Sequence, residues 1–238
     1  MSRPGTRVAP ARPPHRWGLG AFVLVEVVYL AVSGAFALAA ARAEPPVGLI
    51  LVTIAVPTVL AASLAVLIAR IRGNGARTDF RLRWSWRELW IGIAFGFGGL
   101  FVTLPAAALY LSIVGSDTTS AVGEVFEGVR ATWPLALAVF ATVTFVAPVC
   151  EEIVYRGLLW RALEQRWGRI VAALVSTVVF ALAHFEPVRA PLLLVVAIPI
   201  AVARLYTDGL LAGIAAHQVT NLLPGLVLMY GLMGMTPA

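Results

Sequence analysis

The sequence predicts an all-α protein, a polytopic membrane bundle of about eight transmembrane helices. Three observations predict this class. Of the 238 residues, 60% are hydrophobic and only 13% are charged, and the mean hydropathy of +0.89 excludes a soluble globular domain. Several apolar segments reach the roughly 20 residues that a helix needs to cross the hydrocarbon core of a bilayer. The charged residues gather in short clusters between the apolar segments.

The first four apolar segments are long enough to span the membrane as single helices. They are Trp17 to Ala40, Val47 to Ala69, Leu89 to Val114 and Pro134 to about Tyr155. The first exceeds the apolar core of about 7–15 residues found in cleavable signal peptides, so it is expected to remain as a membrane helix. It carries one acidic residue, Glu26, which is expected to hydrogen-bond within the bundle. In the third segment, the glycine-rich run GIAFGFGG predicts close helix packing.

Four shorter apolar runs follow, and they are expected to form short helices packed inside the bundle. Prolines and glycines separate them, and irregular backbone is tolerated at membrane depth where protein or a wet cavity surrounds it. The runs are about Ile170 to Ala183, Pro191 to Ala203, Gly209 to Leu222 and Pro224 to Met235.

The arginines predict the orientation. All basic residues other than histidine are arginines, and they cluster in Arg3 to Arg16, Arg70 to Arg87 and Arg156 to Arg169, whereas the loop Ser116 to Ala131 is mostly acidic. Basic loops remain in the cytoplasm. The chain is therefore expected to be a multi-pass protein of the plasma or inner membrane, with residues 1–16 as a basic cytoplasmic tail. The alternation of arginine and tryptophan in RLRWSWRELW indicates a membrane interface, and no nucleic-acid partner is expected.

Two adjacent glutamates, Glu151 and Glu152, stand at the end of the fourth apolar segment. A charged side chain near the bilayer interior costs at least about 2.5–3.5 kcal/mol, so such a residue normally has a partner or a function. Glu152 and Arg156 are four residues apart and can pair on one helical face. Glu151 is rotated by about 100° from Glu152, which leaves its carboxylate free.

Two histidines lie in apolar segments of the same half of the chain. His184 follows Phe180 by four residues, and His217 precedes Asn221 by four, so each pair shares one helical face. Two buried histidines together with a glutamate pair predict a polar site inside the membrane. The prediction is that the polar atoms of Glu151, His184, His217 and Asn221 surround one cavity.

Three motifs, EEIVYR, FALAH and HQVTN, occur in this order and resemble the signatures of the CPBP family, the CAAX prenyl protease and bacteriocin-processing proteins also called Abi. The resemblance covers roughly Pro134 to Leu222. It implies an intramembrane endopeptidase in which Glu151 activates the attacking water beside His184. It also implies that His217 and Asn221 steady the oxyanion, and that Glu152 and Arg156 form a supporting pair.

The same resemblance implies a division of the chain. Residues 17–133 would form amino-terminal transmembrane helices. Residues 134–238 would form a catalytic core whose last four helices enclose an intramembrane cavity. The expected partners are the lipid bilayer and a membrane-embedded or lipidated peptide substrate, either of the prenylated CAAX type or a leader peptide.

Several alternatives stay open. Peptide hydrolysis needs a base for water and donors for the developing negative oxygen, which these residue types supply. Glu151, His184 and His217 could hold Zn²⁺ with an open position, and a glutamate mechanism without metal is equally open. Two other classes of protein fit the same residues: a catalytically inactive immunity or scaffold protein of this fold, and a proton-coupled transporter.

The depths of two site residues conflict with straight helices. If Arg169 marks the inner surface, His184 lies about 22 Å deeper at 1.5 Å per residue, whereas Glu151 is close to Arg156. We therefore expect one of two departures. Either RGLLWRALEQRWG dips into the bilayer as an amphipathic segment, with Leu158, Leu159, Leu163 and Trp167 toward apolar surroundings, or the fourth helix breaks near Pro148.

Overall fold

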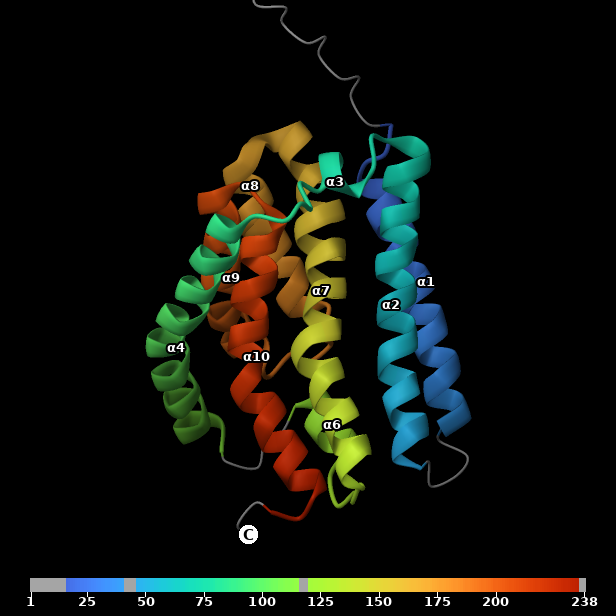
Figure 1. Ribbon diagram of the computed structural model, residues 1–238, viewed down its shortest axis with the longest axis vertical. Helices are drawn as coiled ribbons and strands as arrows, with labels where there is room; N and C mark the ends of the chain where they lie inside the picture. The colour runs from blue at the N-terminus through green and yellow to red at the C-terminus, as the bar shows by residue number, and fades with distance from the viewer. Residues whose placement is uncertain (1–15, 41–45, 116–119, 236–238) are drawn as a thin grey trace, which may run out of the picture.

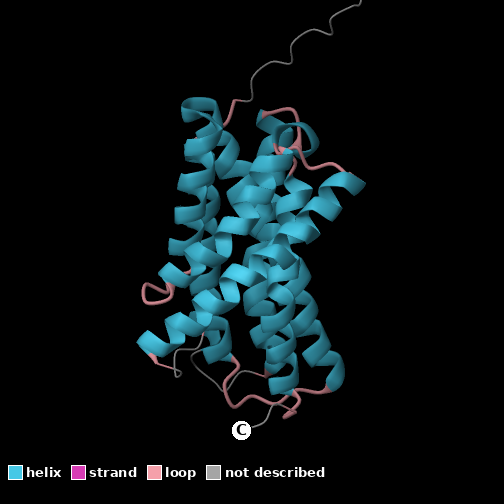
Figure 2. Cartoon of the chain, turned by 90° about the vertical axis from the view of Figure 1, so that its left-hand side faces the viewer, coloured by secondary structure: helices cyan, strands magenta, loops and turns pink. Residues whose placement is uncertain are grey.

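The computed structural model describes residues 16–40, 46–115 and 120–235, and these residues form helices and loops without a strand (Figure 2). Residues 1–15 of the predicted basic tail and residues 116–119 of the predicted outer loop lie outside the described residues. The all-α membrane class is confirmed. Six helical stretches within the described residues are long and apolar enough to cross a membrane.

Five of the six stretches are single helices: α1 (Leu19–Ala40), α2 (Val47–Arg72), α4 (Trp86–Val114), α9 (Ala190–Thr207) and α10 (Leu210–Leu232). Short helices α3 (Ala76–Asp79) and α5 (Ala121–Val125) lie in connections. The expected count of eight spans is not confirmed. The fourth and fifth predicted runs lie on one continuous helical path, Trp133–Leu182, and the last two form one helix, α10, with Pro224 in its interior. Membrane helices tolerate an interior proline where neighbouring groups satisfy the freed carbonyl.

The remaining stretch, Trp133–Leu182, is a 50-residue helical path with two wide turns. It consists of α6 (Trp133–Ala141), the π-helix η1 (Thr142–Val146), α7 (Ala147–Glu151), the π-helix η2 (Glu152–Leu159) and α8 (Trp160–Leu182). Pro148 lies two residues after the end of η1 and has no N–H to donate to the carbonyl four residues earlier, an irregularity that a π-turn can absorb. The predicted break near Pro148 is therefore replaced by a continuous, widened helix.

The path reverses at Gly168, whose φ of 82° lies in the left-handed region that favours glycine. Glu151 lies 17 residues before this glycine and His184 lies 16 residues after it, so both are about 25 Å from the turn at 1.5 Å per residue. The two arms are in contact and meet near the top of Figure 1. The reversal removes the depth conflict.

Arg156, which was expected among the cytoplasmic arginines, is fully buried within the protein. The dip of RGLLWRALEQRWG into the bilayer remains a prediction, and three of its four side chains expected in apolar surroundings are buried. Leu158, Leu159 and Leu163 are buried, whereas Trp167 is half exposed. The first arm of the reversal thus carries its polar groups inside the protein.

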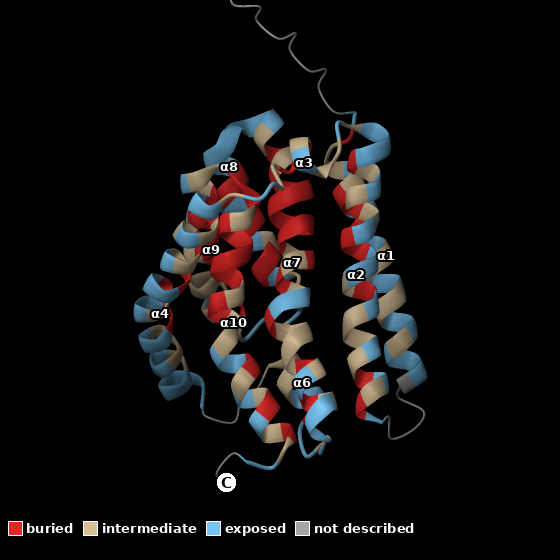
Figure 3. Ribbon diagram, viewed as in Figure 1, coloured by how far each residue is buried: buried red, intermediate tan, exposed pale blue. Residues whose placement is uncertain are grey.

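The glycines of α4 allow this helix to lie close to α9 and α10. A Cβ on Gly92 would lie 2.4 Å from the carbonyl oxygen of Ala212, and one on Gly96 would lie 2.6 Å from Val219 Cβ. The packing role predicted for GIAFGFGG is confirmed. Figure 3 shows that buried residues concentrate in α7, α8 and α10, whereas much of α4 is exposed on the outside of the bundle.

Arginines from distant segments gather at one end of the bundle. The backbone N–H of Arg16 donates to the Arg72 carbonyl (2.8 Å). Arg81 pairs with Asp208, whose carboxylate also lies 3.5 Å from Arg169. Arg130, next to α6, is at the other end, where it donates to the carbonyl of Gly231 (2.6 Å). This distribution agrees with the arginine clusters lying on one side, and the side itself remains a prediction.

Candidate active site

The two adjacent glutamates lie at the junction of α7 and η2 and differ sharply in burial. The Glu151 side chain retains 27% of its accessible surface, whereas that of Glu152 retains none. The wide turns of η2 begin at Glu152, and every residue of η2 is buried. One carboxylate is therefore open to small molecules and the other is a buried structural charge.

Glu152 is held on three sides. Its Oε1 atom lies 3.2 Å from Arg156 Nη1, in an ion pair with no exposed surface on either side chain. The same oxygen lies 3.2 Å from His217 Nδ1 on α10. The other oxygen, Oε2, faces Gly213, where a Cβ would come within 2.7 Å. The ion pair predicted from the spacing of Glu152 and Arg156 is present, and the contact with His217 was not predicted.

His217 connects the two glutamates. Its Nε2 atom lies 3.6 Å from Glu151 Oε2 while its Nδ1 atom contacts Glu152. A neutral imidazole that donates through Nδ1 presents a lone pair at Nε2, and an imidazolium donates through both nitrogens. Glu152 thus orients the ring so that Nε2 faces the exposed carboxylate.

The ring of Phe180 on α8 is a common surface for four site residues. The Arg156 guanidinium carbon lies 4.2 Å from the ring centroid. The rings of His184 and His217 approach Phe180 edge to face, with centroids at 4.8 and 5.5 Å, and Tyr155 approaches it at 5.4 Å. His184 Nδ1 also contacts the Phe180 carbonyl oxygen (2.8 Å), which leaves Nε2 as its remaining nitrogen.

Asn221 lies one turn after His217 on α10 and is bound to η1. Its Nδ2 atom donates to the carbonyl of Val143 (3.1 Å), and Thr144 Oγ1 donates to the Asn221 backbone carbonyl (3.4 Å). Gln218 makes a similar bond to the carbonyl of Phe145 (3.3 Å). The π-turn η1 therefore exposes carbonyls that tie it to α10 beside His217.

The structure thus joins four predicted residues in one chain of contacts, from Glu151 through His217 and Glu152 to Arg156. His184 joins them through the Phe180 ring, and within the described part of the chain no direct polar contact links it to Glu151. The convergence of all four predicted polar groups on one cavity remains a prediction.

Residues 132–223 match a family model described as Type II CAAX prenyl endopeptidase Rce1-like. We refer to residues 132–223 as the Rce1-like segment. The CPBP resemblance predicted from the three motifs is confirmed, and the match contains α7, η2, α8, α9 and the histidine-bearing part of α10. No curated protein and no solved structure matches the chain significantly.

The side chains of the Rce1-like segment do not form a metal-ligating group as they lie. Among the described residues, no cluster of three or more histidine, cysteine, aspartate or glutamate side chains is arranged to hold a metal ion. Both nitrogens of His217 already face carboxylates, and His184 Nδ1 contacts a backbone carbonyl. The set Glu151, His184 and His217 does not fit Zn²⁺ in this arrangement.

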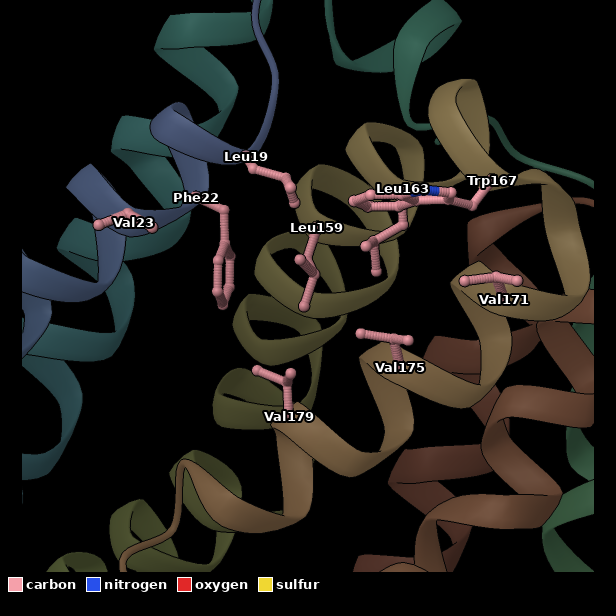
Figure 4. A pocket seen from close by; sticks show the side chains of 9 residues that line it. All are labelled: Leu19, Phe22, Val23, Leu159, Leu163, Trp167, Val171, Val175 and Val179. Atoms are coloured by element: carbon pink, nitrogen blue, oxygen red, sulfur yellow. The ribbon is translucent and has the colours of Figure 1, made fainter.

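An apolar groove of about 500 Å³ lies beside the Rce1-like segment, between α1 and the two arms of the reversal (Figure 4). Phe22 lines it from α1 and also contacts the ring of Tyr155 (5.9 Å). The remaining walls are Leu19, Val23, Leu159, Leu163, Trp167, Val171, Val175 and Val179. Through Phe22, the groove therefore adjoins Tyr155, whose ring packs against Phe180.

Proposed function

We propose that the protein is a CAAX-type intramembrane endopeptidase that hydrolyses a peptide bond of a membrane-associated substrate with water activated by Glu151. The single observation that carries the proposal is the division between the glutamates. Glu151 is partly exposed with His217 Nε2 at 3.6 Å, whereas Glu152 is buried and paired. The match to the Rce1-like family supports the substrate class.

The reaction needs one group that takes and returns a proton. Glu151 takes a proton from water as the water oxygen bonds to the scissile carbonyl carbon and the carbonyl electron pair moves onto its oxygen. The protonated Glu151 then gives the proton to the amide nitrogen, and the C–N bond breaks. Base catalysis of this kind supplies roughly 10²–10⁴-fold in rate. Glu152 cannot take this role, because its carboxylate is fully buried and is held in the ion pair with Arg156.

The developing oxyanion needs hydrogen-bond donors. His184 Nε2 and His217 Nε2 are the candidates nearest to the Phe180 surface, and each donates only when its imidazole is protonated, because Nδ1 carries the proton of the neutral ring. Asn221 uses one amide hydrogen on Val143, and its second amide hydrogen is left for a substrate. Arg156 and Glu152 position His217 and do not touch the substrate in this scheme.

The apolar groove supports a substrate with a long apolar chain. Its lining is almost entirely aliphatic and aromatic, and it lies against the Phe22–Tyr155 contact. A lipidated peptide could place its chain there while its backbone enters the polar site. The transporter and inactive-scaffold alternatives are not favoured, since all site motif residues lie in one half of the chain and all are intact.

The assay uses two fluorescence-quenched peptides that differ only in S-farnesylation of a cysteine four residues from the carboxyl terminus. The wild-type protein in vesicles is expected to release a carboxyl-terminal fragment from the farnesylated peptide and much less from the other, with the products identified by mass spectrometry. Vesicles without protein are the control. Absence of product from both peptides would overturn the proposal. Equal cleavage of the two peptides would show that the groove does not contribute to substrate binding.

A further inference from the structure

Glu26 is a charged residue in the wall of the site that lies outside the Rce1-like segment. It is the only charged residue of α1, and the helix is otherwise almost wholly apolar. An acidic side chain within a membrane span is retained against an unfavourable transfer free energy, which points to a functional contact. Glu26 is half-buried, so part of its surface is in contact with other residues of the protein.

The contact of Glu26 is Tyr155. The Tyr155 hydroxyl interacts with the Glu26 carboxylate, which accepts from it when the two groups are in hydrogen-bonding distance. Phe22 lies one turn before Glu26, on the same face of α1, and its ring meets the ring of Tyr155 edge to face at 5.9 Å. Helix α1 therefore holds the buried Tyr155 twice, at its ring and at its hydroxyl.

Tyr155 in turn supports the surface on which both histidines lie. Its ring meets Phe180 at 5.4 Å and 84°, and Phe180 contacts His184, His217 and Arg156. These contacts form a continuous path from α1 to the histidines. A shift of the Tyr155 ring would move the Phe180 ring against which both imidazoles are placed.

Glu26 and Glu151 also border the same space. Tyr155 and Tyr29 each interact electrostatically with both carboxylates, and Tyr29 lies one turn after Glu26 on α1. The α1 face that carries Phe22, Glu26 and Tyr29 therefore lies toward Tyr155 and Glu151.

We propose that Glu26 is a positioning residue of the catalytic centre: it fixes the Tyr155 hydroxyl, and through Tyr155 and Phe180 it fixes His184 and His217. Its activity test rests on the proposed peptidase function. A purely structural role makes a different prediction, because leucine suits a membrane helix better than glutamate. Replacement by leucine should leave folding intact or improve it while damaging the chemistry.

The activity test compares Glu26→Leu, Glu26→Gln and Tyr155→Phe, with Val27→Leu on the exposed face of α1 as the matched control. Glu26→Leu is expected to lower kcat about 10- to 100-fold with little change in KM, since misplacement of catalytic groups by about 1 Å costs up to roughly 100-fold. Glu26→Gln should retain most activity because its amide oxygen still accepts the hydrogen bond. In a Tyr155→Phe background, Glu26→Leu should cause no further loss.

Wild-type kcat in Glu26→Leu, or losses that multiply in the double variant, would overturn the proposal. A fall in the thermal midpoint of Glu26→Leu in step with its activity would do the same, because it would show a role in folding alone.

A second test needs no substrate. The chain has three histidines, His15, His184 and His217, so isotopically labelled imidazoles give three sets of NMR signals in detergent micelles. The Phe180 ring current shifts the signals of His184 and His217. Glu26→Leu and Tyr155→Phe are both expected to move these two sets and to leave His15 and the Val27→Leu spectrum unchanged.

Unmoved His184 and His217 signals in both variants would overturn the positioning role even if the protein cleaved peptides. Should the wild type cleave nothing while the two sets of signals move, the peptidase proposal fails and the positioning path stands. If Glu26→Leu does not fold, Tyr155→Phe alone decides the spectrum.

Discussion

Glu152 and Arg156 form an ion pair without exposed surface, and its energetic role differs from that of a pair at the protein surface. Exposed pairs contribute only about 0–1 kcal/mol. In a buried pair, the attraction between the charges mainly offsets the cost of removing both from water, so the net contribution is small. Loss of one partner, however, leaves a buried uncompensated charge. Arg156 lies 3.2 Å from Glu152 and 4.2 Å from the centre of the Phe180 ring, and has no other carboxylate in ion-pair distance within the described residues.

Glu152→Gln should therefore destabilise the protein by about 3–5 kcal/mol, as for other broken buried pairs. The double variant Glu152→Gln with Arg156→Met should recover part of this loss because it removes the stranded charge. Thermal unfolding in detergent measures both, with Glu164→Gln in the partly exposed pair with Arg161 as the control. A Glu152→Gln protein as stable as the wild type would contradict a buried ionic role for Glu152.

The spacing of residues in the sequence predicted the contacts within one helix and missed those between helices. The Glu152–Arg156 pair follows from a four-residue spacing. The contacts of His217 with both glutamates join residues about 65 positions apart in the sequence. They depend on Gly213, whose lack of a side chain leaves space for the Glu152 carboxylate beside α10. Phe180 was predicted to share a face with His184, but no spacing reveals that its ring also meets Tyr155, Arg156 and His217.

At the scale of elements, the two π-helices determine how the site is assembled. Single π-turns inside α-helices occur frequently at functional sites because they redirect side chains. Here η1 presents the carbonyls that bind Asn221 and Gln218, and η2 buries all of its residues, from Glu152 to Leu159. Pro148 signalled an irregular helix in the sequence, but its outcome, a wide turn in place of a break, depends on the α10 side chains that bind the exposed carbonyls.

The close packing of α4 on α10 gives a prediction with a control in the same helix. Gly92→Ala would place a Cβ 2.4 Å from the Ala212 carbonyl and is expected to destabilise the bundle by about 1–3 kcal/mol through overpacking. Gly98→Ala has open space and should be neutral or stabilising by up to about 1 kcal/mol through helix propensity. Thermal midpoints measure both. Equal midpoints for the two variants would show that α4 does not depend on this close approach.

At the scale of the whole molecule, the site is shared between the Rce1-like segment and α1. The sequence predicted the membrane class and the Rce1-like segment correctly because composition and motif order are local properties. The count of eight spans is not confirmed, because the fourth and fifth apolar runs lie on one helical path and the last two form one helix that continues through Pro224. The expected depth conflict between Glu151 and His184 is absent because the chain reverses at Gly168, and the spacing of the arginines does not reveal this reversal.

In the proposed mechanism the adjacent glutamates have separate roles, with Glu151 as the base. Glu151→Gln keeps the shape and hydrogen-bonding capacity of the side chain and removes its ability to accept a proton. The decisive measurement is kcat/KM of Glu151→Gln on the farnesylated peptide, beside its thermal midpoint and a Glu127→Gln control in the exposed loop. We expect a fall of at least about 100-fold with an unchanged midpoint. Near-normal cleavage by a folded Glu151→Gln protein would contradict the assignment of Glu151 as the base.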